Sequence, residues 1–133
     1  MKITADTNVL VRASTMDDPG QSALAAQTLR EADIVAVPLP ALCEYAWVLR
    51  TAYKRTRTEV AASIEALLDT PGVHTDESAT RKGLEALRRG GDLADAVIAY
   101  EGLWLGGEEF VTFDRKAAEL LPEIGIPARR LAS

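Results

Sequence analysis

The chain has 133 residues, of which 47% are hydrophobic and 26% charged, and its formal net charge is −5 at pH 7. This size and composition predict one globular domain over residues 1–133 and exclude an intrinsically disordered protein. The acidic charge excludes a general nucleic-acid coat protein, because non-specific affinity for phosphates comes from lysine and arginine. The single cysteine, Cys43, excludes an internal disulfide. Because no apolar run is long enough for a membrane span or a secretory leader, we expect a cytoplasmic protein.

Short apolar runs alternate with helical patterns through the first half of the chain. We predict strands over residues 2–5, 34–37 and 72–75, and helices over residues 7–14, 19–32, 41–53 and 57–68. Asp18 followed by Pro19 is typical of a helix start, with Asp18 as the cap and Pro19 as the first helical residue. Thr56 and Glu59 have the spacing of a capping box, which predicts the start of the last of these helices.

The second half continues this alternation. Helices are predicted over residues 77–89 and from about residue 92 to residue 105, each followed by a glycine pair, and a short helix over residues 115–121. A strand is predicted over residues 110–112, and Ile126 is expected to start an edge strand. Strands that alternate with helices predict an α/β fold in which helices cover both faces of a parallel sheet.

Four carboxylates form the candidate site: Asp6, Glu44, Asp95 and Asp114. Asp6 and Asp114 each follow a predicted strand directly, and functional groups gather beyond the carboxyl ends of parallel strands. Taken singly, Asp6, Asp92 and Asp114 are better explained as helix N-caps. Glu44 differs, because almost all of its neighbours are apolar and burial of an unpaired carboxylate is costly. We therefore expect Glu44 to be a metal ligand that faces a cleft.

Asp92 and Asp95 are three residues apart, so on a helix both project toward the same face, and we expect at most one of them to be a direct metal ligand. Carboxylates held together repel one another, and a bound cation offsets that repulsion. Their oxygens suit Mg²⁺ or Mn²⁺, as one ion or as a pair about 4 Å apart. His74, the only histidine, lies in a predicted strand and is expected to be structural. Arg115 and Lys116 are either contacts to the substrate backbone or surface residues of a helix.

The order of these motifs resembles the PIN domain family, and most closely the VapC toxins of bacterial toxin–antitoxin pairs. The resemblance covers nearly the whole chain, and the order and spacing of its pieces are more specific than any one piece. The pieces are residues 5–10 (Ala-Asp-Thr-Asn-Val-Leu), Glu44 in the helix after the second strand, residues 92–99 (Asp-Leu-Ala-Asp-Ala-Val-Ile-Ala) and residues 111–114 (Val-Thr-Phe-Asp).

This resemblance implies a three-layer α/β/α sandwich with a central, mainly parallel sheet of four to five strands. It also implies an endoribonuclease that uses Mg²⁺ or Mn²⁺ to hydrolyse RNA phosphodiester bonds. The implied catalytic residues and metal ligands are Asp6, Glu44, Asp95 and Asp114, with Asp95 preferred because it matches the aspartate of the family's Asp-x-Leu-Ile-Ala pattern. The implied supporting residues are Asn8, Asp92 and Thr112. The implied partners are RNA, a second copy of the chain in a homodimer, and a VapB-type antitoxin.

Two other functions are compatible with the sequence. One is a PIN-like protein-binding module that has kept the scaffold and lost catalysis. The other is a phosphoacceptor receiver domain, in which Asp76 would follow the third strand and Lys116 would be the lysine that this class needs. The long helical stretch over residues 41–69 breaks the strand–helix alternation of receiver domains, so this class ranks last.

Overall fold

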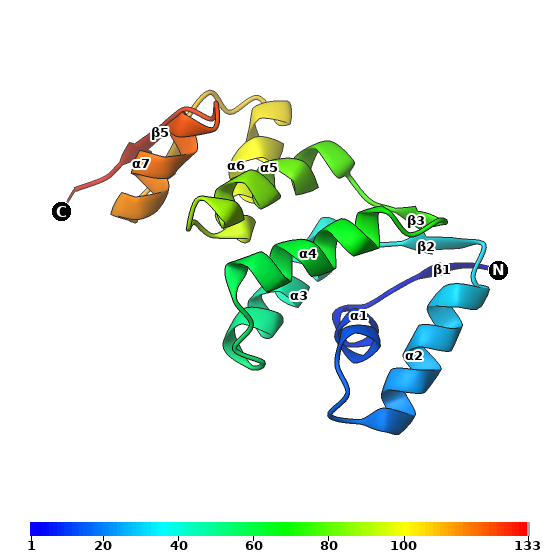
Figure 1. Ribbon diagram of the computed structural model, residues 1–133. Helices are drawn as coiled ribbons and strands as arrows, with labels where there is room; N and C mark the ends of the chain where they lie inside the picture. The colour runs from blue at the N-terminus through cyan, green and yellow to red at the C-terminus, as the bar shows by residue number, and fades with distance from the viewer. Residues whose placement is uncertain (133) are drawn as a thin grey trace. The chain divides into compact units, whose positions relative to one another are not determined.

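The computed structural model describes residues 1–132, which form five strands and seven helices (Figure 1). The chain divides into two compact units, the first over Met1–Glu77 and the second from Ser78 onward. Each unit has its own parallel sheet: β1, β2 and β3 pair in the first, and β4 and β5 pair in the second. No helix within residues 1–132 is both long and apolar enough to cross a membrane.

The first unit contains a three-stranded parallel sheet and four helices. Its strands are β1 (Lys2–Thr4), β2 (Ile34–Ala36) and β3 (Val73–His74), and its helices are α1 (Thr7–Ser14), α2 (Pro19–Glu31), α3 (Leu39–Thr51) and α4 (Arg57–Leu68). β2 is the central strand, with Lys2 of β1 opposite Ile34 and Val73 of β3 opposite Val35. Because parallel neighbours need a long crossover, helices separate the strands along the chain.

Two helices of the first unit begin where the sequence predicts. Oδ1 of Asp18 accepts the N–H of Gln21 at 3.0 Å, and Pro19 occupies the first turn of α2. At α4, the N–H of Glu59 donates to Thr56 Oγ1 at 3.1 Å, and the N–H of Thr56 donates to Glu59 Oε1 at 2.9 Å. The predicted capping box is therefore complete, and both helix starts are confirmed.

The second unit joins three helices to a two-stranded parallel sheet. They are α5 (Glu77–Arg88), α6 (Leu93–Trp104) and α7 (Arg115–Glu123), with strands β4 (Phe110–Thr112) and β5 (Ala128–Arg130). In this sheet Phe110 lies opposite Ala128 and Thr112 opposite Arg130. Gly83 of α5 lies so close to α6 that a Cβ there would come within 2.8 Å of the side chain of Leu93. The absence of a side chain at Gly83 thus permits the close packing of α5 on α6.

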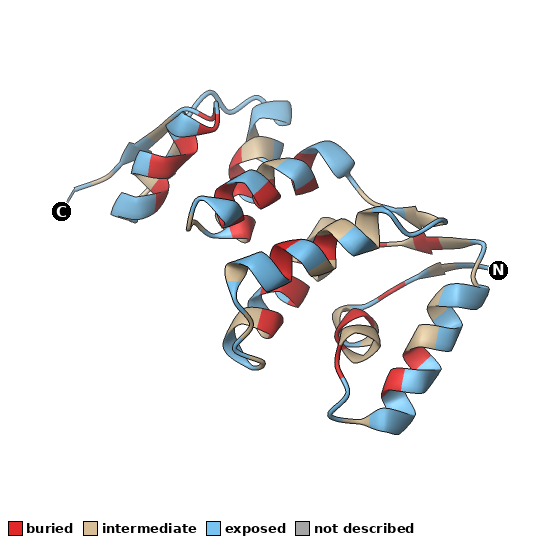
Figure 2. Cartoon of the chain, viewed as in Figure 1, coloured by how far each residue is buried: buried red, intermediate tan, exposed pale blue. Residues whose placement is uncertain are grey.

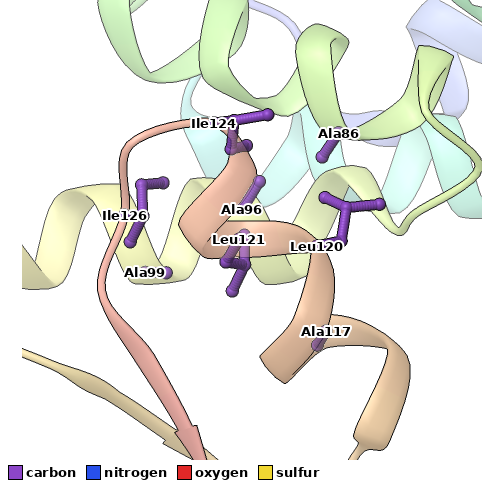
Figure 3. Close-up of a cluster of buried hydrophobic side chains, with 8 residues drawn as sticks. All are labelled: Ala86, Ala96, Ala99, Ala117, Leu120, Leu121, Ile124 and Ile126. Carbon is purple, nitrogen blue, oxygen red and sulfur yellow. The ribbon is translucent and has the colours of Figure 1, made fainter.

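Each unit has its own buried apolar core. In the first unit, large fully buried side chains of α3 and α4 include Leu42, Tyr45 and Ile64. α7 is amphipathic, with buried and exposed positions that alternate around the helix (Figure 2). Burial of this apolar stripe holds α7 against the rest of the second unit. Figure 3 shows the cluster that results: Ala86, Ala96, Ala99, Ala117, Leu120, Leu121, Ile124 and Ile126.

The α/β class and the parallel pairing are confirmed, whereas several element boundaries and the division of the strands into sheets differ from the predictions. α3 begins at Leu39 and not at residue 41, since Pro40 is tolerated in the first turn of a helix, where an N–H would have no partner. β5 begins at Ala128 and not at Ile126, because Ile126 is packed into the apolar cluster of the second unit. The resemblance implied one central sheet of four to five strands, but within residues 1–132 the five strands form two sheets, of three and two strands.

Candidate functional site

Asp6 follows β1 at the carboxyl end of the first sheet and begins α1. Its Oδ1 accepts the N–H of Val9 at 3.0 Å, so the side chain is the N-cap of this helix. The residue is exposed, and its second carboxylate oxygen has no partner among the described residues. The predicted capping role is confirmed, and it leaves Oδ2 available to a ligand.

A cleft of about 350 Å³ lies beside Asp6 in the first unit. Asn8 and Arg12 of α1 line it, and Leu24 of α2 forms part of its apolar wall. Nη1 of Arg12 donates to Asp17 Oδ1 at 3.0 Å, and this ion pair offsets the charge of Arg12. Asn8 is exposed and makes no hydrogen bond through its side chain within residues 1–132. Its amide can therefore donate to, or accept from, a ligand next to Asp6.

Glu44 lies on α3, which packs against α1 in the first unit. The side chain is exposed, whereas its helix neighbours Leu42 and Tyr45 are buried, with 0% and 2% exposure. The apolar residues of α3 therefore face the core, and Glu44 faces solvent. An exposed carboxylate has no desolvation cost for a cation to offset. The role of Glu44 as a metal ligand stays a prediction.

Three carboxylates of the second unit lie close enough for their charges to interact. Asp92 caps α6 by accepting the N–H of Ala94 at 2.9 Å, and Asp95 lies in the first turn of the same helix. Burial raises the pKa of Asp95 above its usual value, and the negative charges of Asp92 and Asp114 raise it further. Asp95 is the half-buried member of the three and caps no helix. Capping therefore does not explain Asp95.

Asp114 is held at the carboxyl end of β4 by two hydrogen bonds. Its N–H donates to Thr112 Oγ1 at 3.0 Å, and its Oδ1 accepts the N–H of Ala117 at 3.1 Å, which caps α7. Thr112 thus fixes the turn that presents Asp114. Arg115 and Lys116 follow in the first turn of α7, where both are exposed, and neither forms an ion pair with a described residue.

Arg130 is near this site but is not among the residues predicted from the sequence. It lies on β5 opposite Thr112, and its Nε donates to the carbonyl oxygen of Phe113 at 3.3 Å. The signal that would have found it is the strand after α7. A parallel strand beside β4 brings its last residue to the same edge of the sheet as the residues that follow β4.

A divalent cation suits the chemistry of these side chains. Carboxylate oxygens are preferred ligands of Mg²⁺ and Mn²⁺. Asp95, whose pKa is raised, pairs with no cationic side chain in the part of the chain that the structure describes. Over residues 1–132, no group of three Asp, Glu, His or Cys side chains is arranged to hold a metal ion. Of the four predicted ligands, Asp6 and Glu44 belong to the first unit, and Asp95 and Asp114 to the second.

Comparison with known proteins identifies one family. A family model described as PIN domain matches residues 3–120. PIN domains are generally nucleases, which are hydrolases, and they generally use divalent metal ions. No curated protein matches the sequence. The matched range includes all four predicted ligands and ends before Arg130.

Proposed function

Because this chain belongs to the PIN domain family, we propose that it is a metal-dependent endoribonuclease that hydrolyses RNA phosphodiester bonds. Its cofactor is Mg²⁺ or Mn²⁺, and its metal ligands are Asp6, Glu44, Asp95 and Asp114. The observation that carries the proposal is the half-buried carboxylate of Asp95, which has acidic neighbours and no cationic partner among the described residues. Carboxylates in such a group repel one another, and a bound cation removes that cost.

The chain's own residues orient the ligands and the substrate. Asp6 and Asp114 each use one oxygen to cap a helix, which restricts the rotation of the carboxylate and leaves the other oxygen for a cation. A divalent ion bound to such a carboxylate oxygen would supply positive charge that lowers the pKa of water and offsets the charge that develops on the phosphate. Arg115 and Lys116 contact the RNA backbone next to Asp114. The residues that support the ligands are Asn8, Asp92 and Thr112.

The proposed enzyme is the toxin of a toxin–antitoxin pair. In this role it is a VapC-type ribonuclease that acts in the cytoplasm, forms a homodimer and is inhibited by a VapB-type antitoxin protein. The support is the order of the carboxylate motifs, which resembles that of VapC toxins over nearly the whole chain. Residues 1–133 act together as one PIN domain, an assignment supported by the family match, which extends from the first unit into the second.

Cleavage of RNA by the purified protein tests the enzymatic proposal. The wild-type protein is expected to cleave RNA in Mg²⁺ or Mn²⁺ and to lose this activity in EDTA. Asp6→Asn and Asp95→Asn are each expected to lower the rate by at least about 100-fold, because loss of a metal ligand costs more than loss of a supporting residue. Glu119→Gln is the matched control, since Glu119 is exposed on α7. If the double variant Asp6→Asn/Asp95→Asn cleaved RNA at the wild-type rate, the proposal would be overturned.

Expression in bacteria tests the toxin role separately. Wild-type protein is expected to arrest growth, and Asp95→Asn is expected to relieve the arrest while its thermal unfolding shows a folded protein. Co-expression of a small DNA-binding protein encoded beside this chain is expected to restore growth. If bacteria that express the wild-type protein grew normally while the purified protein cleaved RNA, the toxin role would be rejected and the enzymatic proposal would stand.

An inactive PIN-like protein-binding module is the second candidate. The observation that favours it is that no three metal-binding side chains form a group within residues 1–132. Such a module would leave RNA intact at every concentration of divalent ion, and Asp95→Asn would not change its binding to a protein partner. RNA cleavage that is abolished both by EDTA and by Asp95→Asn would exclude it.

A further inference from the structure

Arg130 has a fixed backbone position at the edge of the second sheet. β5 runs parallel to β4, with Arg130 opposite Thr112. The next residue, Leu131, donates its N–H to the carbonyl oxygen of Thr112 at 2.7 Å. The pairing of the two strands therefore continues past Arg130, and the residue is anchored on both sides.

The protein uses only part of the guanidinium of Arg130. Nε donates to the carbonyl oxygen of Phe113 at 3.3 Å, and the residue is exposed. Within residues 1–132, Nη1 and Nη2 have no hydrogen-bond partner and the side chain forms no ion pair. Arg129 differs, because its Nε donates to Glu109 Oε1 at 2.8 Å. The contact with Phe113 thus orients Arg130 without neutralising its charge.

This unpaired charge lies next to the turn that presents Asp114. Phe113, whose carbonyl oxygen accepts from Arg130, directly precedes Asp114 in the chain. The N–H of Asp114 donates to Thr112 Oγ1, and Thr112 lies opposite Arg130. Capping of a carbonyl group needs only one N–H of the guanidinium. The remaining N–H groups form a planar fork that matches two oxygens of a phosphate.

We propose that Arg130 binds a backbone phosphate of the RNA beside the bond that is cleaved. This inference rests on the proposed ribonuclease function, and it adds a substrate-binding residue that lies beyond the range of the family match. An acidic site repels a polyanion, so the RNA backbone needs cationic contacts near the carboxylates. Arg130 supplies such a contact from a strand, where its position is more rigid than on a loop.

The salt dependence of RNA binding tests this role. Binding of a fluorescent single-stranded RNA is measured by anisotropy over a range of salt concentrations in Mg²⁺, in the Asp95→Asn background so that the RNA stays intact. Arg130→Ala is expected to weaken binding about fivefold at low salt. It is also expected to reduce the slope of log K against log salt by about 0.7, the value for one phosphate contact to a single strand.

Arg129→Ala is the matched control, because it removes the same charge from the same strand. Its slope is expected to equal that of the parent protein, since Glu109 already neutralises Arg129. Arg130→Gln keeps an amide donor for Phe113 and removes the charge, so it replaces Arg130→Ala if thermal unfolding shows that the alanine variant is unfolded. In cleavage assays without the Asp95 substitution, Arg130→Gln is expected to raise KM and leave kcat nearly unchanged.

An unchanged slope in the Arg130 variants would overturn the inference. Equal losses of slope in the Arg129 and Arg130 variants would also overturn it, because they would show a general effect of net charge. Both results are compatible with RNA cleavage by the wild-type protein, so neither would overturn the proposed ribonuclease function. Failure of the proposed function is recognised differently, since wild-type protein would then not cleave RNA in Mg²⁺ or Mn²⁺, and the role of Arg130 would fall with it.

Discussion

Asp114 is both a helix cap and a proposed metal ligand, and two substitutions separate these roles. Its Oδ1 accepts the N–H of Ala117 at 3.1 Å. Asp114→Ala removes this cap and is expected to lower the free energy of unfolding by about 1 kcal/mol, which for a chain of this size lowers Tm by roughly 3 °C. Asp114→Asn keeps the cap, because the amide oxygen of asparagine accepts the same hydrogen bond, so its free energy of unfolding is expected to stay within about 0.5 kcal/mol of wild type.

Thermal unfolding followed by circular dichroism, together with RNA cleavage in Mg²⁺, reads out the two roles. A metal ligand needs its negative charge, so both variants of Asp114 are expected to lose at least about tenfold in cleavage rate, although only the alanine variant loses stability. Full cleavage by Asp114→Asn would refute the ligand role. Equal Tm values for the two variants would refute the reasoning about the cap.

Three further predictions concern other positions. Glu44 is exposed, so Glu44→Gln is expected to change the free energy of unfolding by less than about 0.5 kcal/mol and to lower the rate of RNA cleavage. Cleavage by this variant at the wild-type rate would show that Glu44 is not a metal ligand. Burial and neighbouring carboxylates raise the pKa of Asp95, so without metal its contribution to stability is complete below the usual carboxyl pKa of 3.8 and is lost as the pH rises through the raised pKa. Denaturation across this pH range is expected to show that the wild-type protein loses more stability than Asp95→Asn as the pH rises. Parallel curves of unfolding free energy against pH would show that the pKa of Asp95 is not raised in the folded protein. Gly83→Ala brings a Cβ within 2.8 Å of Leu93 Cγ and is expected to lower the free energy of unfolding by about 1–3 kcal/mol. In Gly102→Ala the added Cβ meets no atom within 4 Å, and this variant is expected to be more stable than wild type by about 0.5–1 kcal/mol. Urea denaturation compares the two variants, and equal changes in stability would contradict the close packing of α5 on α6.

The helix starts could be predicted from the sequence because capping acts within three or four residues. Asp18 and Pro19 begin α2, and Thr56 and Glu59 begin α4, as their spacing indicates. The same local chemistry predicted that Asp6 caps α1. The order of strands and helices followed from these signals and from the apolar runs between them.

The surroundings of Glu44 and Arg130 depend on longer-range structure. The apolar neighbours of Glu44 in the sequence indicated that much of α3 faces the interior, but they could not show which face of the helix carries Glu44. In the structure Leu42, Tyr45 and Leu49 form a buried stripe at helical spacing, and Glu44 falls outside it. Arg130 gains its place only when β5 pairs with β4, and the helix α7 separates these strands in the chain. A strand after α7 is expected from the sequence, but its pairing with β4 has no local signal, so the place of Arg130 beside Asp114 does not follow from the residues around Arg130 alone.

Titration of Mn²⁺ into the protein, followed by isothermal calorimetry, tests most directly whether the carboxylates bind a divalent cation. Wild-type protein is expected to bind Mn²⁺ at or below millimolar concentration, and Asp95→Asn is expected to weaken binding at least about tenfold. Glu119→Gln, which removes an exposed carboxylate of α7, is expected to bind as wild type does. Absence of binding by wild-type protein at millimolar Mn²⁺, or equal binding by Asp95→Asn, would contradict the proposed metal site.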